Sequence, residues 1–333
     1  MRQAFAALFA VPALAAAASA ACPTAASSAP FADFWVYGFG SGATTYAPTF
    51  GSPFNTTDPD RLGYYFAVFE FPGLDAGTLP PISALTFEVT LLNSSTFDPT
   101  NTVLYDPTYD ARASYLDRSL DEDPGRPIEL YAVELAGGRD LAALRESDSM
   151  YLPAPEYYVP QPIDFGGGGP RRVLYSIDGA PEPGTAPGFD TEPLAIATAE
   201  GVGARIPDGT RLRFQVSPSP AARAYLTEQI RTTGRIAFVV SSLHSAGEFG
   251  AGGEDIWPRL ATKESFGTLD PSVQIAFGSA ADFDGNGSVD VNDLLGFLGA
   301  FRVGGAGADF DGSGSVDVND LLGFLGAFRA GGC

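Results

Sequence analysis

Two short stretches near the C-terminus carry acidic, amide and hydroxyl side chains at the spacing of a calcium-binding loop. Calcium is a hard cation that takes six to eight oxygen ligands, and a twelve-residue loop supplies them from positions one, three, five, seven, nine and twelve. Gly287 stands at position six, where the sharp turn needs unusual backbone freedom. In this first loop the predicted ligands are Asp282, Asp284, Asn286, the backbone carbonyl of Ser288, Asp290 and Asp293.

The same pattern returns in residues 308–329, which repeat residues 281–302 with a single difference. Serine replaces Asn286 at position five, and because its hydroxyl is the weaker ligand we expect the second ion to bind less tightly. Each loop holds four mutually repelling aspartates, so we expect metal binding to drive folding. The alternative is an acidic, turn-rich tail with no specific cation. The ligands predicted for the second Ca2+ are Asp309, Asp311, Ser313, Ser315, Asp317 and Asp320.

A short apolar helix is expected after each loop, and the spacing leaves no room for a helix before the second loop. Only 15 residues lie between the two loops, and they consist of the first helix and a glycine-rich linker. Two glycines weaken this helix by roughly 1 kcal/mol each relative to alanine, so we expect the two helices to depend on packing against each other. The periodicity predicts one stripe of Leu294, Leu298 and Phe301, with Leu295 and Phe297 beside it.

A tandem of two loop–helix calcium units resembles a type I dockerin domain. The resemblance covers residues 281–329, within a predicted module of residues 281–333. It implies docking onto a cohesin-like or other surface protein, in two orientations related by pseudo-symmetry. Such dockerins carry a hydroxyl pair at loop positions ten and eleven and a basic pair in the helix. This chain has Val291 and Asn292, then Leu298 and Gly299, so the calcium chemistry carries over while the choice of partner does not.

The first 21 residues have the organisation of a secretory signal peptide. Arg2 is followed by the apolar stretch Ala4–Ala18 and by small residues suited to cleavage at residues 18–20. No other apolar stretch approaches the length of a membrane span, so we expect a protein that is secreted or at the cell surface. Cys22 follows the cleavage site, which leaves a lipoprotein as an alternative to free secretion.

The chain contains two cysteines, Cys22 and Cys333. Export permits a disulfide between them, and closing so long a loop would contribute roughly 5 kcal/mol if the bridge is unstrained. An intermolecular bridge and two free thiols are the alternatives, and the sequence does not choose among the three.

A net charge of −21 separates the protein from nucleic-acid-binding classes, because nucleic acids require a basic surface. The same charge disfavours contact with anionic membranes. It fits a soluble protein that repels copies of itself.

Residues 30–278 read as one mostly-β domain, a large jelly-roll-like β-sandwich with long loops. Residues 93–127 and 150–193 are expected to be loop insertions, and Ala222–Arg231 a single helix with Tyr225, Leu226 and Ile230 on one side. Strands are predicted at residues 64–71, 82–92, 128–135, 172–178, 210–217, 234–242 and 272–277.

The order of these strands is similar to that of DNRLRE-type jelly-roll domains, which are grouped with carbohydrate-binding modules. The segment ATKES, residues 261–265, stands where that family has a short motif with a basic–acidic pair. Asp60-Arg61-Leu62 is the nearest trace of the family's signature. The resemblance implies a secreted, non-catalytic domain that binds polysaccharide.

Three classes of function follow for the β domain. A polysaccharide-binding module would use aromatic rings on loops to stack on sugars, while Trp35, Tyr64 and Phe66 are expected in the core. A polysaccharide lyase or glycoside hydrolase is the enzymatic alternative, with His244 as the one histidine available. A structural cell-surface protein with a calcium-dependent assembly tail is the third. The loop aromatics proposed as sugar ligands are Tyr105, Tyr109, Tyr115, Tyr157, Tyr158 and Trp257.

Overall fold

The structure is a computed structural model, and the description below concerns only those residues whose placement it defines. The described residues are 24–27, 29–37, 40–42, 44–49, 63–74, 79–93, 102–107, 127–148, 160–165, 171–174, 186–187, 193–199, 203, 205–242, 244, 257–265, 269–279, 281–284, 288–305, 308–310 and 315–330.

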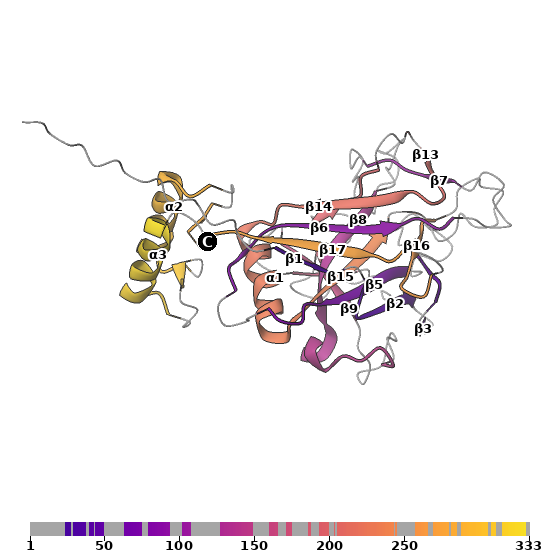
Figure 1. The fold of residues 1–333 in the computed structure, drawn as a ribbon, viewed down its shortest axis with the longest axis horizontal. Helices are drawn as coiled ribbons and strands as arrows, with labels where there is room; N and C mark the ends of the chain where they lie inside the picture. The colour runs from indigo at the N-terminus through magenta and orange to yellow at the C-terminus, as the bar shows by residue number, and fades with distance from the viewer. Residues whose placement is uncertain are drawn as a thin grey trace, which may run out of the picture.

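The fold is mostly β, with several antiparallel sheets and three α-helices in the described residues (Figure 1). We call residues 24–277 the central β region and residues 281–330 the helical tail. A four-stranded antiparallel sheet contains, in spatial order, β1 (Thr24–Ser27), β17 (Ser272–Phe277), β6 (Ile82–Thr90) and β14 (Arg211–Val216).

The second sheet is larger and has nine strands. All of its strand pairs are antiparallel except the pair of β10 and β11. Its order is β11 (Ala186–Pro187), β10 (Arg171–Leu174), β9 (Pro160–Asp164), β8 (Ile128–Leu135), β15 (Arg235–Ser242), β5 (Gly63–Glu70), β2 (Ala32–Tyr37) and β3 (Gly40–Gly42), with β12 (Ala195–Ile196) beside β8. Two small pairs join β13 (Arg205–Pro207) to β7 (Thr102–Leu104) and β16 (Arg259–Ala261) to β4 (Tyr46–Pro48).

One hydrophobic core is shared by the two larger sheets. Along β14 every second side chain is buried, which is the pattern of a strand with one covered face. All eight residues of β15 are buried, so both faces of the larger sheet are covered at its centre. Phe87 of β6 packs against Phe69 of β5 and Phe238 of β15, with ring centroids 5.8 Å apart in each pair. Aromatic packing therefore joins the two sheets.

Helix α1 (Pro220–Thr233) closes one end of this core. Its N-cap Ser219 accepts a hydrogen bond from the Ala222 amide, and it ends at Gly234, whose φ of 70° suits glycine. Leu226 and Ile230 are buried in the shared core. The prediction of this helix and of its apolar side is confirmed.

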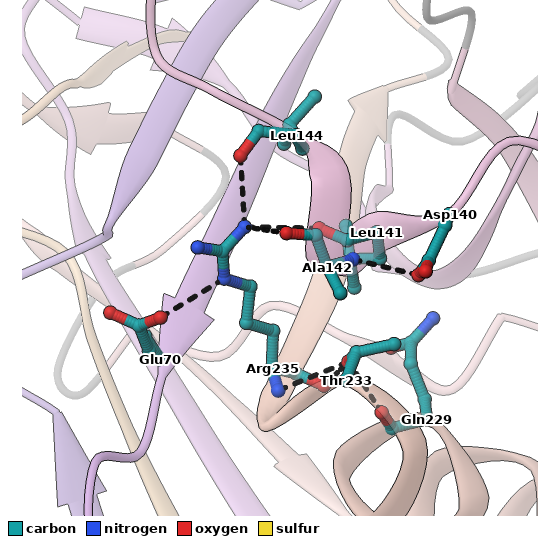
Figure 2. A network of polar contacts seen from close by, with 8 residues as sticks. All are labelled: Glu70, Asp140, Leu141, Ala142, Leu144, Gln229, Thr233 and Arg235. Carbon is teal, nitrogen blue, oxygen red and sulfur yellow. Dashed lines mark hydrogen bonds and ion pairs between the residues drawn. The ribbon is translucent and has the colours of Figure 1, made fainter.

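Arg235, at the start of β15, ties the strand to a short 3-10 turn, η4 (Leu141–Ala143), that lies over the outer face of the larger sheet (Figure 2). Its guanidinium donates to the carbonyls of Leu141 at 3.0 Å, Ala142 at 3.3 Å and Leu144 at 2.9 Å, and pairs with Glu70 at 3.2 Å. A single buried cation thereby donates to three carbonyls of the turn, one of which, that of Leu141, also accepts from the Leu144 amide at 3.3 Å.

The segment ATKES crosses from β16 to the edge of β2. The Lys263 amide and the Tyr65 hydroxyl donate to one oxygen of Asp33, at 2.9 and 2.8 Å. Asp33 is fully buried, and burial, together with the neighbouring Glu264 carboxylate, raises its pKa from 3.8 to about 7 against the lowering effect of these two donors. The segment therefore has a structural role as an anchor for the N-terminal strands.

Most strand predictions are confirmed, and two loop predictions are wrong. β5, β8, β15 and β17 match the predicted runs to within a residue or two at each end. The predicted insertions 93–127 and 150–193 contain the short strands β7 and β9–β11, of which β10 overlaps the strand predicted at residues 172–178. β7, β9 and β11 were not predicted because they are two to five residues long, which is too short for an alternating pattern to be recognised.

Candidate metal centre

Each of the two predicted calcium loops is held in shape by the aspartate at position twelve, which is the first-turn acid of the following helix. In the first loop, Asp293 of α2 (Val291–Arg302) is fully buried. One of its oxygens accepts from the Asp284 amide at 3.0 Å and the other from the Asp290 amide at 2.7 Å. The second pair belongs to a capping box that begins the helix. The loop is therefore folded back over the start of its own helix.

The second loop also closes on the first-turn acid of its helix, α3 (Val318–Ala330), but the donating loop amide is at position two instead of position three. Asp320 is fully buried and accepts from the amides of Phe310 and Asp317, both at 2.6 Å. The position-nine aspartates also correspond, because Asp290 and Asp317 each accept from the amide two residues later at 2.7 Å. The two repeats thus share this part of their geometry as well as their sequence.

Three carboxylates of the first loop converge on one point. Asp282, Asp284 and Asp293 each offer an oxygen, and these atoms lie within 4.8 Å of one another. Oxygens bound to a single calcium ion at 2.3–2.6 Å are separated by no more than about 5 Å, so this donor set fits a calcium ion. Asp282 is almost fully buried and Asp284 is exposed, which places the cluster at the surface with one wall inside the protein.

The remaining predicted ligands divide into described and undescribed residues. Ser288 and Ser315, at position seven, are exposed, and Asp309 has one side-chain oxygen buried, as Asp282 does. Asn286, Asp311 and Ser313 lie outside the described residues. The acidic oxygens of the first loop therefore converge. In the second loop the described aspartates are Asp309, Asp317 and Asp320, at positions one, nine and twelve.

A symmetric aromatic core holds the two repeats together. Phe297 of α2 and Phe324 of α3 are fully buried and stack face to face, with centroids 4.0 Å apart and ring planes 3° from parallel. Phe283 meets Phe297 edge-on at 5.7 Å, and Phe310 meets Phe324 edge-on at 5.7 Å. The repeat unit is thus duplicated in space about the central stack, and each loop contributes a ring to the core.

This arrangement corrects the predicted helix stripe. The buried face of α2 consists of Phe297 with Leu294 and Phe301, whereas Leu298 is 39% exposed and Leu295 62% exposed. The reason is Gly296, where an added Cβ would lie 3.0 Å from the Phe283 ring. The missing side chain lets that ring pack on the helix, which turns Phe297 inward and the leucines outward.

Each helix consequently carries an exposed apolar stripe, and the two stripes are equivalent. On α2 the stripe consists of Val291, Leu295 and Leu298, with exposed fractions of 60%, 62% and 39%. On α3, Val318, Leu322 and Leu325 have 60%, 63% and 39%. Apolar residues at this helical spacing usually face a partner, and in the described structure these face solvent.

The aromatic residues proposed as sugar ligands receive no support from the described part of the chain. Tyr105 is half-buried against the shared core, its hydroxyl donates to the Ala197 carbonyl, and burial raises its pKa to about 12. Trp257 is also half-buried, just before β16. Partial burial leaves less of each ring available for stacking, and sugar contact by these two residues stays a prediction. Tyr109, Tyr115, Tyr157 and Tyr158 lie outside the described residues.

The predicted core aromatics and His244 lie within the described residues, and the two cysteines do not. Tyr64 and Phe66 are buried and Trp35 is partly buried against the core, as predicted. His244 is fully buried, a poor position for taking a proton from a polymeric substrate. Cys22 and Cys333 lie outside the described residues, as does the predicted signal peptide.

Comparison of the chain with protein-family models and with curated proteins found no match. Among the described residues, no helix combines the length and apolar character needed to span a membrane.

Proposed function

We propose that this protein is a secreted calcium-binding protein whose helical tail is a dockerin-like docking module and whose central β region is a non-catalytic, jelly-roll-like β-sandwich. The observation that carries the proposal is the convergence of Asp282, Asp284 and Asp293 within 4.8 Å, at the start of a helix with an exposed apolar stripe. Cation binding and partner binding thereby belong to one small unit. The sandwich assignment is supported by the core that the two larger sheets share.

Calcium would hold each loop closed, and the closed loop keeps its phenylalanine in the core of the helical tail. Three acidic oxygens brought this close repel one another unless a cation is bound. Phe283, the second residue of the first loop, packs edge-on against both Phe297 and Phe324. Opening the loop would therefore withdraw a ring from the tail's core, and the exposed stripes of the two helices would lose their fixed spacing. Docking should accordingly depend on calcium.

The character of the two stripes defines the partner we propose. Valine and leucine make up both stripes, so the partner is a surface protein, cohesin-like in its role, that offers an apolar face. The exposed fractions of the two stripes agree to within one per cent, so either stripe would serve as the docking face. Polysaccharide remains the ligand class proposed for the β-sandwich from its resemblance to carbohydrate-binding modules.

Calcium binding is tested by titrating the mature chain and its Asp282→Ala, Asp309→Ala double variant by calorimetry. We expect two ions per wild-type chain and none in the variant. Circular dichroism should show loss of tail helix in the variant, with the central β region intact. Equal helix content with calcium and with chelator in the wild-type chain would refute calcium-dependent folding.

Docking is tested with recombinant cohesin domains in calcium, using Leu298→Asp, Leu325→Asp and the double variant. Each single variant should retain binding through its intact stripe, and the double variant should lose it. Val303→Asp, which changes a residue that is 72% exposed outside both stripes, is the matched control. Retention on a panel of polysaccharides, with reducing ends assayed in the same samples, separates a sugar-binding sandwich from a hydrolase or lyase and from a purely structural one.

A further inference from the structure

The joint between the central β region and the helical tail is buried at the residues that the structure describes, 278, 279, 281 and 282. β17 ends at Phe277 and leads directly into the tail (Figure 1). The Gly278 amide donates to the Pro81 carbonyl at 2.9 Å, and a Cβ at Gly278 would lie 2.8 Å from the Cβ of Ser83. Ser279 is buried, and its carbonyl accepts from the Asp282 amide at 3.1 Å. The first calcium loop therefore begins in contact with the central β region.

Arg223 of α1 closes this joint from the other side. Its side chain is buried in the described structure, with the residue only 8% exposed, and its Nη1 donates to the main-chain carbonyl of Asp282 at 2.9 Å. A hydrogen bond from a charged donor is stronger than one between neutral groups. The Arg223 Nε is buried too and has no hydrogen-bond partner among the described residues. The contact with Asp282 therefore offsets part of the cost of burying this charge.

Asp282 serves two structures at once. Its carbonyl is held by Arg223, while its carboxylate belongs to the cluster with Asp284 and Asp293. The position of this one residue thus decides both the shape of the first loop and the attachment of the tail. The second loop has almost the same sequence, but it follows residues 303–307 of the tail instead of a strand of the central region.

We propose that the first loop is a calcium-dependent joint, in which Arg223 couples cation binding to a fixed orientation of the tail on the central β region. The proposal rests on the calcium binding proposed above and adds a separate role for each loop. The first loop orients the tail, and the second completes the tail's own core. Because coupling between two equilibria is reciprocal, calcium in the first loop strengthens the Arg223 contact, and that contact strengthens calcium binding by the same factor.

Calcium titrations with one loop disabled test the reciprocity. Asp311→Ala leaves the first loop intact, and Asp284→Ala leaves the second. Adding Arg223→Gln should weaken calcium binding roughly fivefold or more in the first background. In the second background, binding should change by less than about twofold, because that loop is not attached to Arg223. Equal effects in both backgrounds, or no effect in either, would overturn the joint.

Hydrogen exchange of the full mature chain tests the attachment itself. With calcium, Arg223→Gln should speed amide exchange in residues 278–284 by roughly tenfold or more, since a hydrogen bond to a buried charge is lost. Exchange within α2 and α3 should be unchanged. Gly278→Ala leaves Arg223 in place and should speed exchange in the same residues by displacing the turn from Ser83. Arg213→Gln, at a half-exposed ion pair with Glu88, is the control and should have no effect on this segment.

The outcomes separate this proposal from the one on which it rests. If chelator leaves α2, α3 and residues 278–284 of the wild-type chain unchanged, the calcium-dependent function itself fails. If chelator exposes the tail helices, but both Arg223→Gln and Gly278→Ala leave residues 278–284 protected within about twofold, only the joint is overturned. If Arg223→Gln also speeds amide exchange in the strands of the central β region, exchange of residues 278–284 in Gly278→Ala decides whether the joint is upheld or overturned.

Discussion

Each tail helix contains two glycines three residues apart, and their surroundings predict opposite responses to the same substitution. A Cβ at Gly296 would lie 3.0 Å from Cδ1 of Phe283, and one at Gly323 would lie 2.9 Å from Cδ1 of Phe310. At Gly299 and Gly326 a Cβ would meet no atom within 4 Å. Alanine at the first position of each pair must therefore displace a ring, and alanine at the second enters open space.

The expected magnitudes follow from helix propensity and packing. Gly299→Ala should stabilise the tail by about 1 kcal/mol, the propensity difference between the two residues in a helix interior. Gly296→Ala gains the same amount but overpacks Phe283, which stands edge-on to Phe297 at 5.7 Å and to Phe324 at 6.3 Å. Overpacking a close-packed core costs about 1–3 kcal/mol. The free energies of tail opening should therefore differ by about 1–3 kcal/mol between the two variants.

Amide exchange within α2 and α3 at saturating calcium measures these free energies in the full chain. Gly299→Ala should slow exchange, and Gly296→Ala should not. Gly326→Ala and Gly323→Ala repeat the comparison in the second copy, where the closer approach predicts an effect at least as large. Equal stabilisation by alanine at all four positions would show that the rings yield freely, and the account of the buried face would then be wrong.

Two further predictions concern the central β region. Asp33→Asn should raise the free energy of unfolding above about pH 7 by up to roughly 4 kcal/mol. The pKa of Asp33 is about 7 in the folded protein against 3.8, so stability that the wild-type chain has below pH 4 is lost as the pH rises to 7. Urea unfolding at pH 5 and pH 8 measures this loss, and a variant that kept the wild-type pH dependence would contradict the prediction. Arg235→Met should lower the free energy of unfolding by about 3 kcal/mol, because three carbonyls and Glu70 lose a buried donor. Arg213→Met changes a half-exposed ion pair and should lower it by less than about 1 kcal/mol. Similar urea midpoints for the two variants would contradict the importance of the network in Figure 2.

The hydrophobic pattern of short segments predicted those strands and helices whose conformation depends mainly on neighbouring residues in the sequence. The runs at residues 64–71, 128–135 and 272–277 are long, apolar and β-branched or aromatic, so almost any tertiary context makes them strands. The helix predicted at Ala222–Arg231 is present and extends over Pro220–Thr233, from the cap Ser219 to Gly234. The acidic cluster of Asp282, Asp284 and Asp293 lies within the first predicted ligand set, because spacing in a twelve-residue loop is a local property. Short strands such as β7 and β9 were missed because they are too short for an alternating pattern to be recognised.

The sequence by itself determined the predicted ligand sets, the mostly-β character of the central region and the duplication of the tail. Only the tertiary structure decided which side of each tail helix is buried. Leu294, Leu295, Phe297, Leu298 and Phe301 supply apolar residues on two overlapping faces, and periodicity cannot rank them. The choice depends on a ring from the preceding loop that fits against Gly296. The contact between Arg223 and Asp282 joins residues 59 apart in the chain, and no local pattern encodes such a distance.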